Sequence, residues 1–376
     1  YKNGHLSKDQ LEKVKTEIEK HEAISDYLYE ETNIPGLEDF TQGNMTEERN
    51  QEDEQFTKLI QSTIRRSFIK IGAIMGVIVL ALVLAIIFVL PTFVSNFYYH
   101  PNEVVGKSAD GIETRKMALD LSVFSELYLP GAYRNNVIAE AEGYGNYQVT
   151  IPQNSSYDGR FTTVVGKLNQ GKLTLYNPDT LRLPSSNAFV APKEIQFGFH
   201  NMGAAGTREE AFAALEELKD NTLYQAYFSL DHLMDYHDFY QQMGADAHWV
   251  AIYPGSDNFN HMGVNLKVGG LLLDWDRESY PLLSQLDNDR TAKPFTIEED
   301  PALMQTHFLS LLSYMKDHPE ITQLFGNHFN NWNEIIDYIN ANGMQVYGFT
   351  AVADKETILK ISKGENISYV YTEPLP

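Results

Sequence analysis

The residues best suited to chemistry form a short acidic and histidine-rich run, Asp231, His232, Asp235, His237 and Asp238. If residues 231–243 form a helix, Asp231, Asp235 and Asp238 share one face, and carboxylate oxygens are ligands that hard cations prefer. The two histidines are five residues apart, so they do not face the same way on a helix. We therefore interpret the run as a solvated helix face that begins at an aspartate cap, and not as a metal site.

The rest of the sequence offers few groups for catalysis. It contains no Gly-x-Ser-x-Gly elbow, no glycine-rich phosphate loop and no His-Glu-x-x-His motif. It also contains no cysteine, which excludes a disulfide scaffold, a cysteine-ligated metal and a cysteine nucleophile. We interpret His248 beside Trp249, and the triplet Asp274-Trp275-Asp276, as structural. The sequence predicts a protein that is not an enzyme and that needs no metal or cofactor.

Composition and charge narrow the class of partner. The 376 residues include 29 Lys and Arg against 51 Asp and Glu, and this formal charge of −22 argues against direct nucleic-acid binding. Residues 1–70 carry 10 basic and 15 acidic side chains, which leaves 19 and 36 for residues 95–376. Both parts are therefore acidic. The chain begins at Tyr1 without a methionine, so we expect further residues to precede it.

One uncharged segment divides the chain. Residues 71–94 are 24 residues without a charge, which is above the ~20 that a helix needs to cross a bilayer. Gly72 and Gly76 form a Gly-x-x-x-Gly step that can bring two such helices together, so self-association is one open possibility. The sequence predicts a single-span membrane protein with one transmembrane helix at 71–94.

The flanking charges predict the orientation. Four basic residues lie within the 15 residues before the span, namely Lys58, Arg65, Arg66 and Lys70. Residues 95–110, after the span, contain one basic residue, Lys107. Basic residues concentrate on the cytoplasmic side of a span, so we expect a cytoplasmic N-terminus and an extracellular C-terminus in the cell membrane. The aromatic residues that follow at 97–99 are typical of the outer interface.

The predicted cytoplasmic segment, residues 1–70, is short and all-α. Its apolar residues recur at spacings of three and four, which indicates thin stripes along helices that are otherwise charged. Seventy residues with thin stripes bury little surface of their own, so we expect the stripes to contact another protein. A small helical bundle without a partner is the alternative. The candidate partner-binding residues are Leu11, Val14, Ile18, Ile24, Tyr27, Leu28, Phe56, Leu59, Ile60 and Ile64.

The extracytoplasmic part is predicted to be a large α/β region of two domains. Residues 95–190 are rich in short strand signals, including a hairpin at Asn169-Gln170-Gly171, so we expect a β-rich domain near the membrane. Residues 191–376 alternate strands and helices, which predicts an α/β sensor domain. Thr207 with Glu210 predicts a capped helix start there, and residues 231–243 are expected to be helical.

Four segments together resemble a known family. They are YKNGHLSKDQLEKVKTEIEKHEAISDYLYE (1–30), RRSFIKIG (65–72), DLSVFSELYLPG (120–131) and GMQVYGFTAVADKETILKI (343–361). With the span at 71–94 and the α/β exterior, they are similar to the membrane-anchored anti-sigma factors of Gram-positive bacteria, the sigma-factor-regulator family. Many anti-sigma domains carry a His-x-x-x-Cys-x-x-Cys zinc site, and this chain without cysteine would be of the zinc-free sort.

The resemblance implies that the cytoplasmic helices hold an extracytoplasmic-function sigma factor at the membrane and release it on an envelope signal. The stripe residues named above would then form the contact surface, and apolar burial would supply the affinity. The implied partners are that sigma factor, the lipid bilayer, and a second membrane protein or a second copy of the chain. Two other classes of function stay open: a membrane-tethered extracellular enzyme, and an envelope adaptor.

Overall fold

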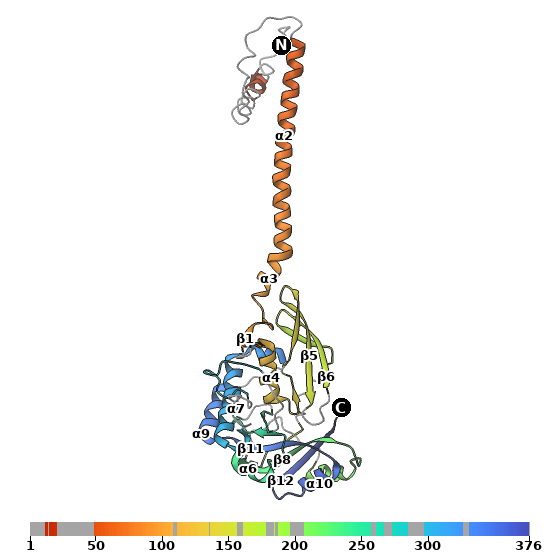
Figure 1. The fold of residues 1–376 in the computed structure, drawn as a ribbon, viewed down its shortest axis with the longest axis vertical. Helices are drawn as coiled ribbons and strands as arrows, with labels where there is room; N and C mark the ends of the chain where they lie inside the picture. The colour runs from red at the N-terminus through yellow and green to blue at the C-terminus, as the bar shows by residue number, and fades with distance from the viewer. Residues whose placement is uncertain are drawn as a thin grey trace. The chain divides into compact units, whose positions relative to one another are not determined.

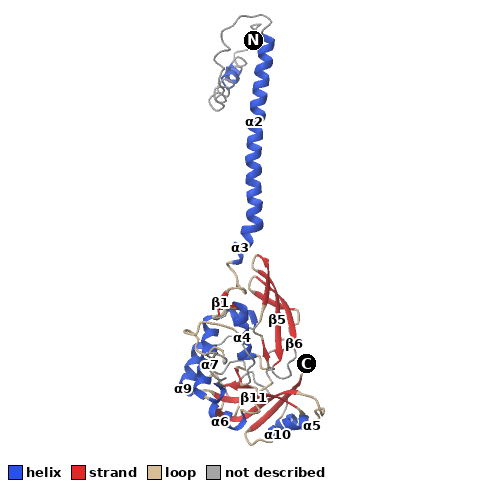
Figure 2. Ribbon diagram, viewed as in Figure 1, coloured by secondary structure: helices blue, strands red, loops and turns tan. Residues whose placement is uncertain are grey.

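The computed structural model of the protein describes residues 12–13, 15–20, 49–107, 111–134, 136–155, 161–177, 184, 187–195, 207–256, 261–266, 273–284, 297–325 and 331–375. Residues Tyr1–Leu82 and Val83–Pro376 form two compact units, which are described separately. Figure 1 gives the element labels, and Figure 2 distinguishes helices from strands.

The predicted membrane segment is helical throughout. Helix α2 (Arg49–Leu84) continues into a π-helical turn, η2 (Ala85–Val89), and then into α3 (Leu90–Ser95). The stretch Phe56–Ser95 is long and apolar enough to cross a membrane, and its most apolar part has no buried residues. This finding agrees with the predicted span. Helix α2 begins in the charged segment before the apolar residues and continues into them without a break. The stripe pattern indicates a helix in that charged segment.

A first antiparallel sheet follows the span in sequence. Its strands are β3 (Ala132–Tyr133), β4 (Ile138–Gly143), β5 (Asn146–Ser155), β6 (Phe161–Asn169) and β7 (Lys172–Leu175), in the order β3-β5-β6-β7 with β4 also on β5. The β6–β7 connection is the predicted hairpin, since Asn169 pairs with Lys172 and both Gln170 and Gly171 have positive φ. Two short strands, β1 (Val104–Lys107) and β2 (Glu113–Arg115), pair separately.

A second antiparallel sheet forms the C-terminal part. Its order is β10-β9-β11-β8-β12, with bounds β8 (Tyr224–Asp235), β9 (Trp249–Ile252), β10 (Gly263–Asn265), β11 (Gln345–Ala353) and β12 (Ile367–Pro374). The helices are α5 (Arg208–Glu216), α6 (Tyr236–Met243), α7 (Pro301–Asp317), α8 (Glu320–Phe325), α9 (Trp332–Asn342) and α10 (Lys355–Ser362), with the 3-10 turn η4 (Ile297–Glu299). The α/β class predicted for this region is confirmed. Figure 1 shows α7 beside α9.

Alternation along the strands divides the second sheet into two faces. Ala226, Phe228 and Leu230 join the main hydrophobic cluster, whereas Tyr227, which lies between Ala226 and Phe228, packs with Phe189 and Trp249 in a smaller aromatic cluster. This is the period of two expected for a sheet that is buried on both faces. The capping box predicted at Thr207 and Glu210 is present at the start of α5.

Helix α4 (Lys116–Tyr128) connects the two sheets. All but one of its residues are buried, and it packs against β10, α7 and α8. One hydrophobic cluster contains residues from α4, from the first sheet and from the second sheet, such as Leu121, Val149 and Phe228. The boundary proposed near residue 190 therefore separates two sheets whose cores are continuous, and that boundary stays a prediction.

The helix predicted for residues 231–243 is wrong in its first half. Strand β8 extends to Asp235 because Asp235 and Met234 still pair with Gln345 and Val346 of β11. The helix begins only afterwards, with Asp235 as its cap, whose side chain accepts a hydrogen bond from the backbone N–H of His237. Asp231, Asp235 and Asp238 therefore do not share a helical face.

Candidate functional site

The first candidate site is the apolar stripe of α2. The stripe begins at Phe56, and Leu59, Ile60 and Ile64 follow it by three, four and eight residues. Residues at these spacings lie on one face of a helix. Leu59 and Ile64 each expose 50% of their surface, and Phe56 and Ile60 are half-buried. Since an exposed leucine or isoleucine retains apolar surface that a partner can cover, this face can bind another apolar surface.

The other predicted contact residues are only partly described. Ile18 lies in a described helical stretch and exposes 45% of its surface. Leu11, Val14, Ile24, Tyr27 and Leu28 lie outside the described residues. The structure thus brings Phe56, Leu59, Ile60 and Ile64 together on α2, while the grouping of the N-terminal residues stays a prediction.

The helix continues from this stripe into the membrane segment. Arg65, Arg66 and Lys70 are exposed on α2 between the stripe and the apolar residues. Gly72 and Gly76 also face open space, because a Cβ built on either meets nothing within 4 Å. The glycine step is therefore accessible on the helix surface, as the self-association hypothesis requires.

A second candidate site is a buried polar cluster around α4 that composition and motifs did not reveal. Lys116 Nζ lies 3.0 Å from Asp120 Oδ2 and 2.9 Å from Glu320 Oε1. Tyr99 and Tyr314 donate hydrogen bonds to the two oxygens of Asp120, at 2.5 and 2.7 Å. Asp120 is fully buried, so its charge is balanced by one cation and two hydroxyl donors. This cluster joins the segment after the span to α4, α7 and α8.

Electrostatics fix the charge states in the cluster. Burial alone would lower the pKa of Lys116, but the carboxylates of Asp120 and Glu320 outweigh it and raise that pKa. For the acid Glu320 burial acts in the opposite direction and would raise the pKa. Hydrogen bonds from His318 and Lys116 outweigh burial and lower this pKa to about 2. The pKa of the Tyr99 hydroxyl is raised by burial and by the negative Asp120. Lys116 and Glu320 are thus charged, and Tyr99 is neutral, at neutral pH.

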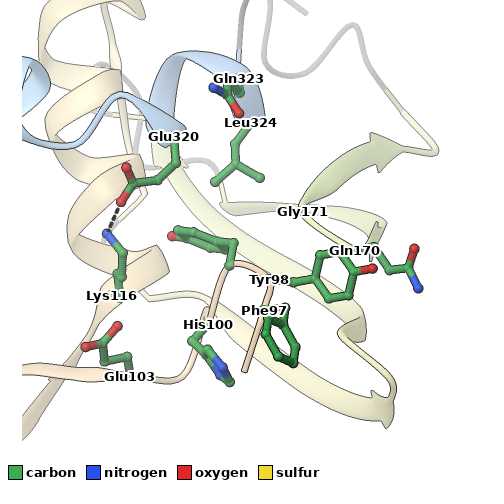
Figure 3. A pocket seen from close by; sticks show the side chains of 11 residues that line it. Phe97, Tyr98, His100, Glu103, Lys116, Gln170, Gly171, Glu320, Gln323 and Leu324 are labelled. Atoms are coloured by element: carbon green, nitrogen blue, oxygen red, sulfur yellow. Dashed lines mark ion pairs between the residues drawn. The ribbon is translucent and has the colours of Figure 1, made fainter. Parts of the chain in front are cut away.

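A cavity of about 430 Å³ opens beside this ion pair. Its volume is in the range of small-molecule sites. Figure 3 shows the Lys116–Glu320 pair at one side and the rings of Phe97 and Tyr98 at the other. The walls offer both aromatic faces and polar groups, so the cavity can accept a small ligand that is partly polar. It is lined by Phe97, Tyr98, Tyr99, His100, Glu103, Lys116, Gln170, Gly171, Glu320, Gln323 and Leu324.

A second buried acid on α4 fastens it to the C-terminal sheet. Glu126 Oε1 and Oε2 accept hydrogen bonds from the backbone N–H and Nδ2 of Asn265, at 2.8 and 2.7 Å. Trp249 Nε1 donates to the Glu126 carbonyl at 2.9 Å. His307 Nε2 lies 3.7 Å from Glu126 Oε1. All four residues are buried, which gives them a structural role in joining the helix to the sheet.

The residues singled out for chemistry have structural contacts. His248 Nδ1 accepts a hydrogen bond from the backbone N–H of Val352, and Trp275 Nε1 donates to the Tyr280 carbonyl. Asp276 accepts hydrogen bonds from the backbone N–H groups of Glu278 and Ser279. Among the described residues, no group of three or more His, Asp or Glu side chains is arranged to hold a metal ion.

Comparison with known proteins supplies one match. Residues 215–371 match the family described as sigma factor regulator C-terminal. The matched region runs from the end of α5 into β12 and so contains nearly all of the second sheet. No curated protein and no solved structure matches the chain. The predicted relation to an anti-sigma-factor regulator family is confirmed by this match.

Proposed function

We propose that this chain, whose residues 215–371 match the sigma factor regulator C-terminal family, sequesters an extracytoplasmic-function sigma factor at the cell membrane. In this proposal the N-terminal 70 residues are cytoplasmic and bind the sigma factor. The region from 95 onward is extracellular, with a membrane-proximal part to 190 and a sensor from 191, and it releases the sigma factor when it receives an envelope signal. The family is a regulatory one, so binding and not catalysis is the activity.

The observation that carries the proposal is the exposed stripe on α2 in a chain of this family. Leu59 and Ile64 each keep half of their surface exposed on a helix that runs directly into the apolar span. A partner that covers this face is held within a few turns of the membrane. The basic residues at 65, 66 and 70 support a cytoplasmic position for the stripe.

The cavity beside Lys116 and Glu320 supports signal reception by the extracytoplasmic part. It lies next to Phe97 and Tyr98, which follow the last turn of the span at Ser95. A ligand there would contact residues directly connected to the membrane helix. The proposal therefore assigns reception to a site close to the element that leads to the cytoplasm.

The test is the affinity of the detergent-solubilised chain for its purified sigma factor. Replacing Leu59 and Ile64 with alanine removes about 2 kcal/mol of apolar burial from the interface, which corresponds to a ~30-fold weaker Kd. The matched control is Gln61→Ala, an exposed residue of the same helix away from the stripe, which should leave the Kd within about 2-fold. Equal affinities for all variants would remove the stripe from the interface.

A further inference from the structure

The outer end of the membrane helix has a gap in its hydrogen bonding. In η2 the N–H of Leu90 donates to the Ala85 carbonyl, which is the i to i−5 pairing of a π-helix. The next donor in that register would be residue 91, which is a proline and has no N–H. In ordinary α-helical pairing the N–H of Leu90 would donate to the Ile86 carbonyl, but this N–H already donates to the Ala85 carbonyl. Both helical donors for the Ile86 carbonyl are therefore removed.

An unpaired carbonyl at this depth is costly. Ile86 lies nine residues before Ser95, or about 13 Å along a helix, inside the stretch that is apolar enough to span a membrane. A backbone group without a partner in hydrocarbon costs several kcal/mol. The gap needs a donor from elsewhere in the chain.

The tip of the β4–β5 hairpin supplies that donor. Tyr144 Oη donates to the Ile86 carbonyl at 3.2 Å. The next residue, Gly145, donates its N–H to Ser95 Oγ at 2.8 Å, and Ser95 Oγ in turn donates to the Pro91 carbonyl at 2.7 Å. The tip thus lies along the last turns of the helix, and Figure 1 shows α3 beside the end of this hairpin.

The conformation of the tip shows that Tyr144 is an unusual choice. Tyr144 and Gly145 are the two central residues of the turn, with φ of 55° and 77°. Such turns favour Asn-Gly, and a left-handed conformation costs a residue like tyrosine about 1 kcal/mol or more. Gly145 is required, because a Cβ there would lie 2.6 Å from the Tyr98 ring. The hydrogen bond to Ile86 explains why a tyrosine occupies this strained position.

We propose that the β4–β5 tip, Gly143–Asn146, is a membrane-interface element that inserts at the headgroup boundary beside the last turns of the span. Tyrosine is a residue that prefers this depth, and the neighbouring Phe93 and Phe97 expose 58% and 71% of their surfaces. The partner is the phospholipid interface on the side of the C-terminal region. The inference rests on the membrane span of the proposed function and is independent of the sigma factor.

The contact also links the extracytoplasmic core to the span. Strand β5 begins at the tip, and its residues Val149 and Ile151 are fully buried in the main hydrophobic cluster. A displacement of this sheet would therefore move the point at which Tyr144 contacts the helix. The tip provides a direct route from the extracytoplasmic sheet to the membrane helix.

The test uses the absence of cysteine from the chain, which makes single-cysteine labelling specific. The full-length variant Asn146→Cys, labelled with bimane, is reconstituted in phosphatidylcholine–phosphatidylglycerol vesicles that contain lipids brominated near the headgroup. Ile78→Cys marks the span. Asn154→Cys, on the same strand about 26 Å farther from the tip, is the matched control.

We expect quenching at residue 146 of at least half that at residue 78, and almost none at residue 154. Adding Tyr144→Ser to Asn146→Cys should reduce the quenching at least 2-fold, because the side chain that reaches Ile86 is lost. Quenching at 146 no greater than at 154, with 78 quenched, would overturn the membrane-interface proposal and leave the span intact. An absence of quenching at all three positions would overturn the span together with this inference.

Discussion

Lys116→Met tests whether the buried cluster stabilises the fold of the unit Val83–Pro376. Lys116 is the cation that balances fully buried Asp120, and it also pairs with Glu320. Removing the lysine leaves the Asp120 carboxylate with only the hydroxyl donors of Tyr99 and Tyr314. A methionine retains most of the apolar stem, so the loss is mainly electrostatic.

The expected size follows from the burial of the pair. Removing one partner of a buried ion pair costs about 3–5 kcal/mol, and the two tyrosine donors place this variant near the lower value, ~3 kcal/mol. The matched control is Lys167→Met, which breaks the 2.7 Å pair with Glu142. Both members of that pair are about 40% exposed. We expect that control to lose much less free energy of unfolding than Lys116→Met, because solvent screens an exposed pair.

The assay is chemical unfolding of the full chain in detergent, followed by tryptophan fluorescence. Trp249 and Trp275 are buried in the unit Val83–Pro376 and report on its unfolding. Adding Asp120→Asn to Lys116→Met should restore at least about 1 kcal/mol, since it removes the unbalanced charge. If Lys116→Met and Lys167→Met lose the same free energy of unfolding, the reasoning from burial is refuted.

Three further predictions concern the same unit. The stabilisation from Glu320, whose pKa is lowered from 4.5 to about 2, is present above pH 4.5 and is lost as the pH falls toward 2; Glu320→Gln should therefore show a shallower loss of stability in an acid titration followed by fluorescence. Glu126→Ala should lower the free energy of unfolding by about 2–3 kcal/mol in urea titrations, because the backbone N–H and the side-chain amide of Asn265 both lose their acceptor. A loss below about 0.5 kcal/mol would contradict this. Gly263→Ala should cost about 3 kcal/mol and lower the Tm, because its Cβ would collide with the backbone carbonyl of Val250, and an unchanged Tm would contradict the β9–β10 pairing.

The elements that were predicted correctly are those whose structure is determined by residues close together in the sequence. The capping box at Thr207 and Glu210 depends on two side chains and the adjacent backbone, so it forms as predicted at the start of α5. The β6–β7 turn at Gln170-Gly171 has a glycine at a positive φ, which the sequence makes visible. The long apolar helix is equally local, since its length and lack of charge decide its environment.

The errors came from long-range pairing and from buried polar residues. Residues up to Asp235 remain in β8 because β11 pairs with them, and β11 is more than a hundred residues away in sequence. The turn at Tyr144-Gly145 was not predicted because tyrosine is not a typical turn residue. Helix α4 has Lys116, Asp120 and Glu126 in its buried surface, so it lacks the one-sided apolar stripe from which a helix is usually identified.

The candidate site was predictable to a different extent in its two parts. The stripe of Phe56, Leu59, Ile60 and Ile64 depends only on helical spacing, and α2 places these residues on one face. The cavity beside Lys116 and Glu320 depends on the approach of α8 to α4, which are about two hundred residues apart in sequence. No spacing within either segment indicates that contact.

The most direct measurement of the central claim is to isolate the full-length chain from native membranes and to identify and quantify the proteins that accompany it. The proposal predicts one extracytoplasmic-function sigma factor in near-equimolar amount, which is lost when Leu59→Asp and Ile64→Asp are combined and is retained with Gln61→Asp. Recovery of the intact, membrane-inserted chain without any sigma factor, or equal recovery of the sigma factor with all three proteins, would contradict it.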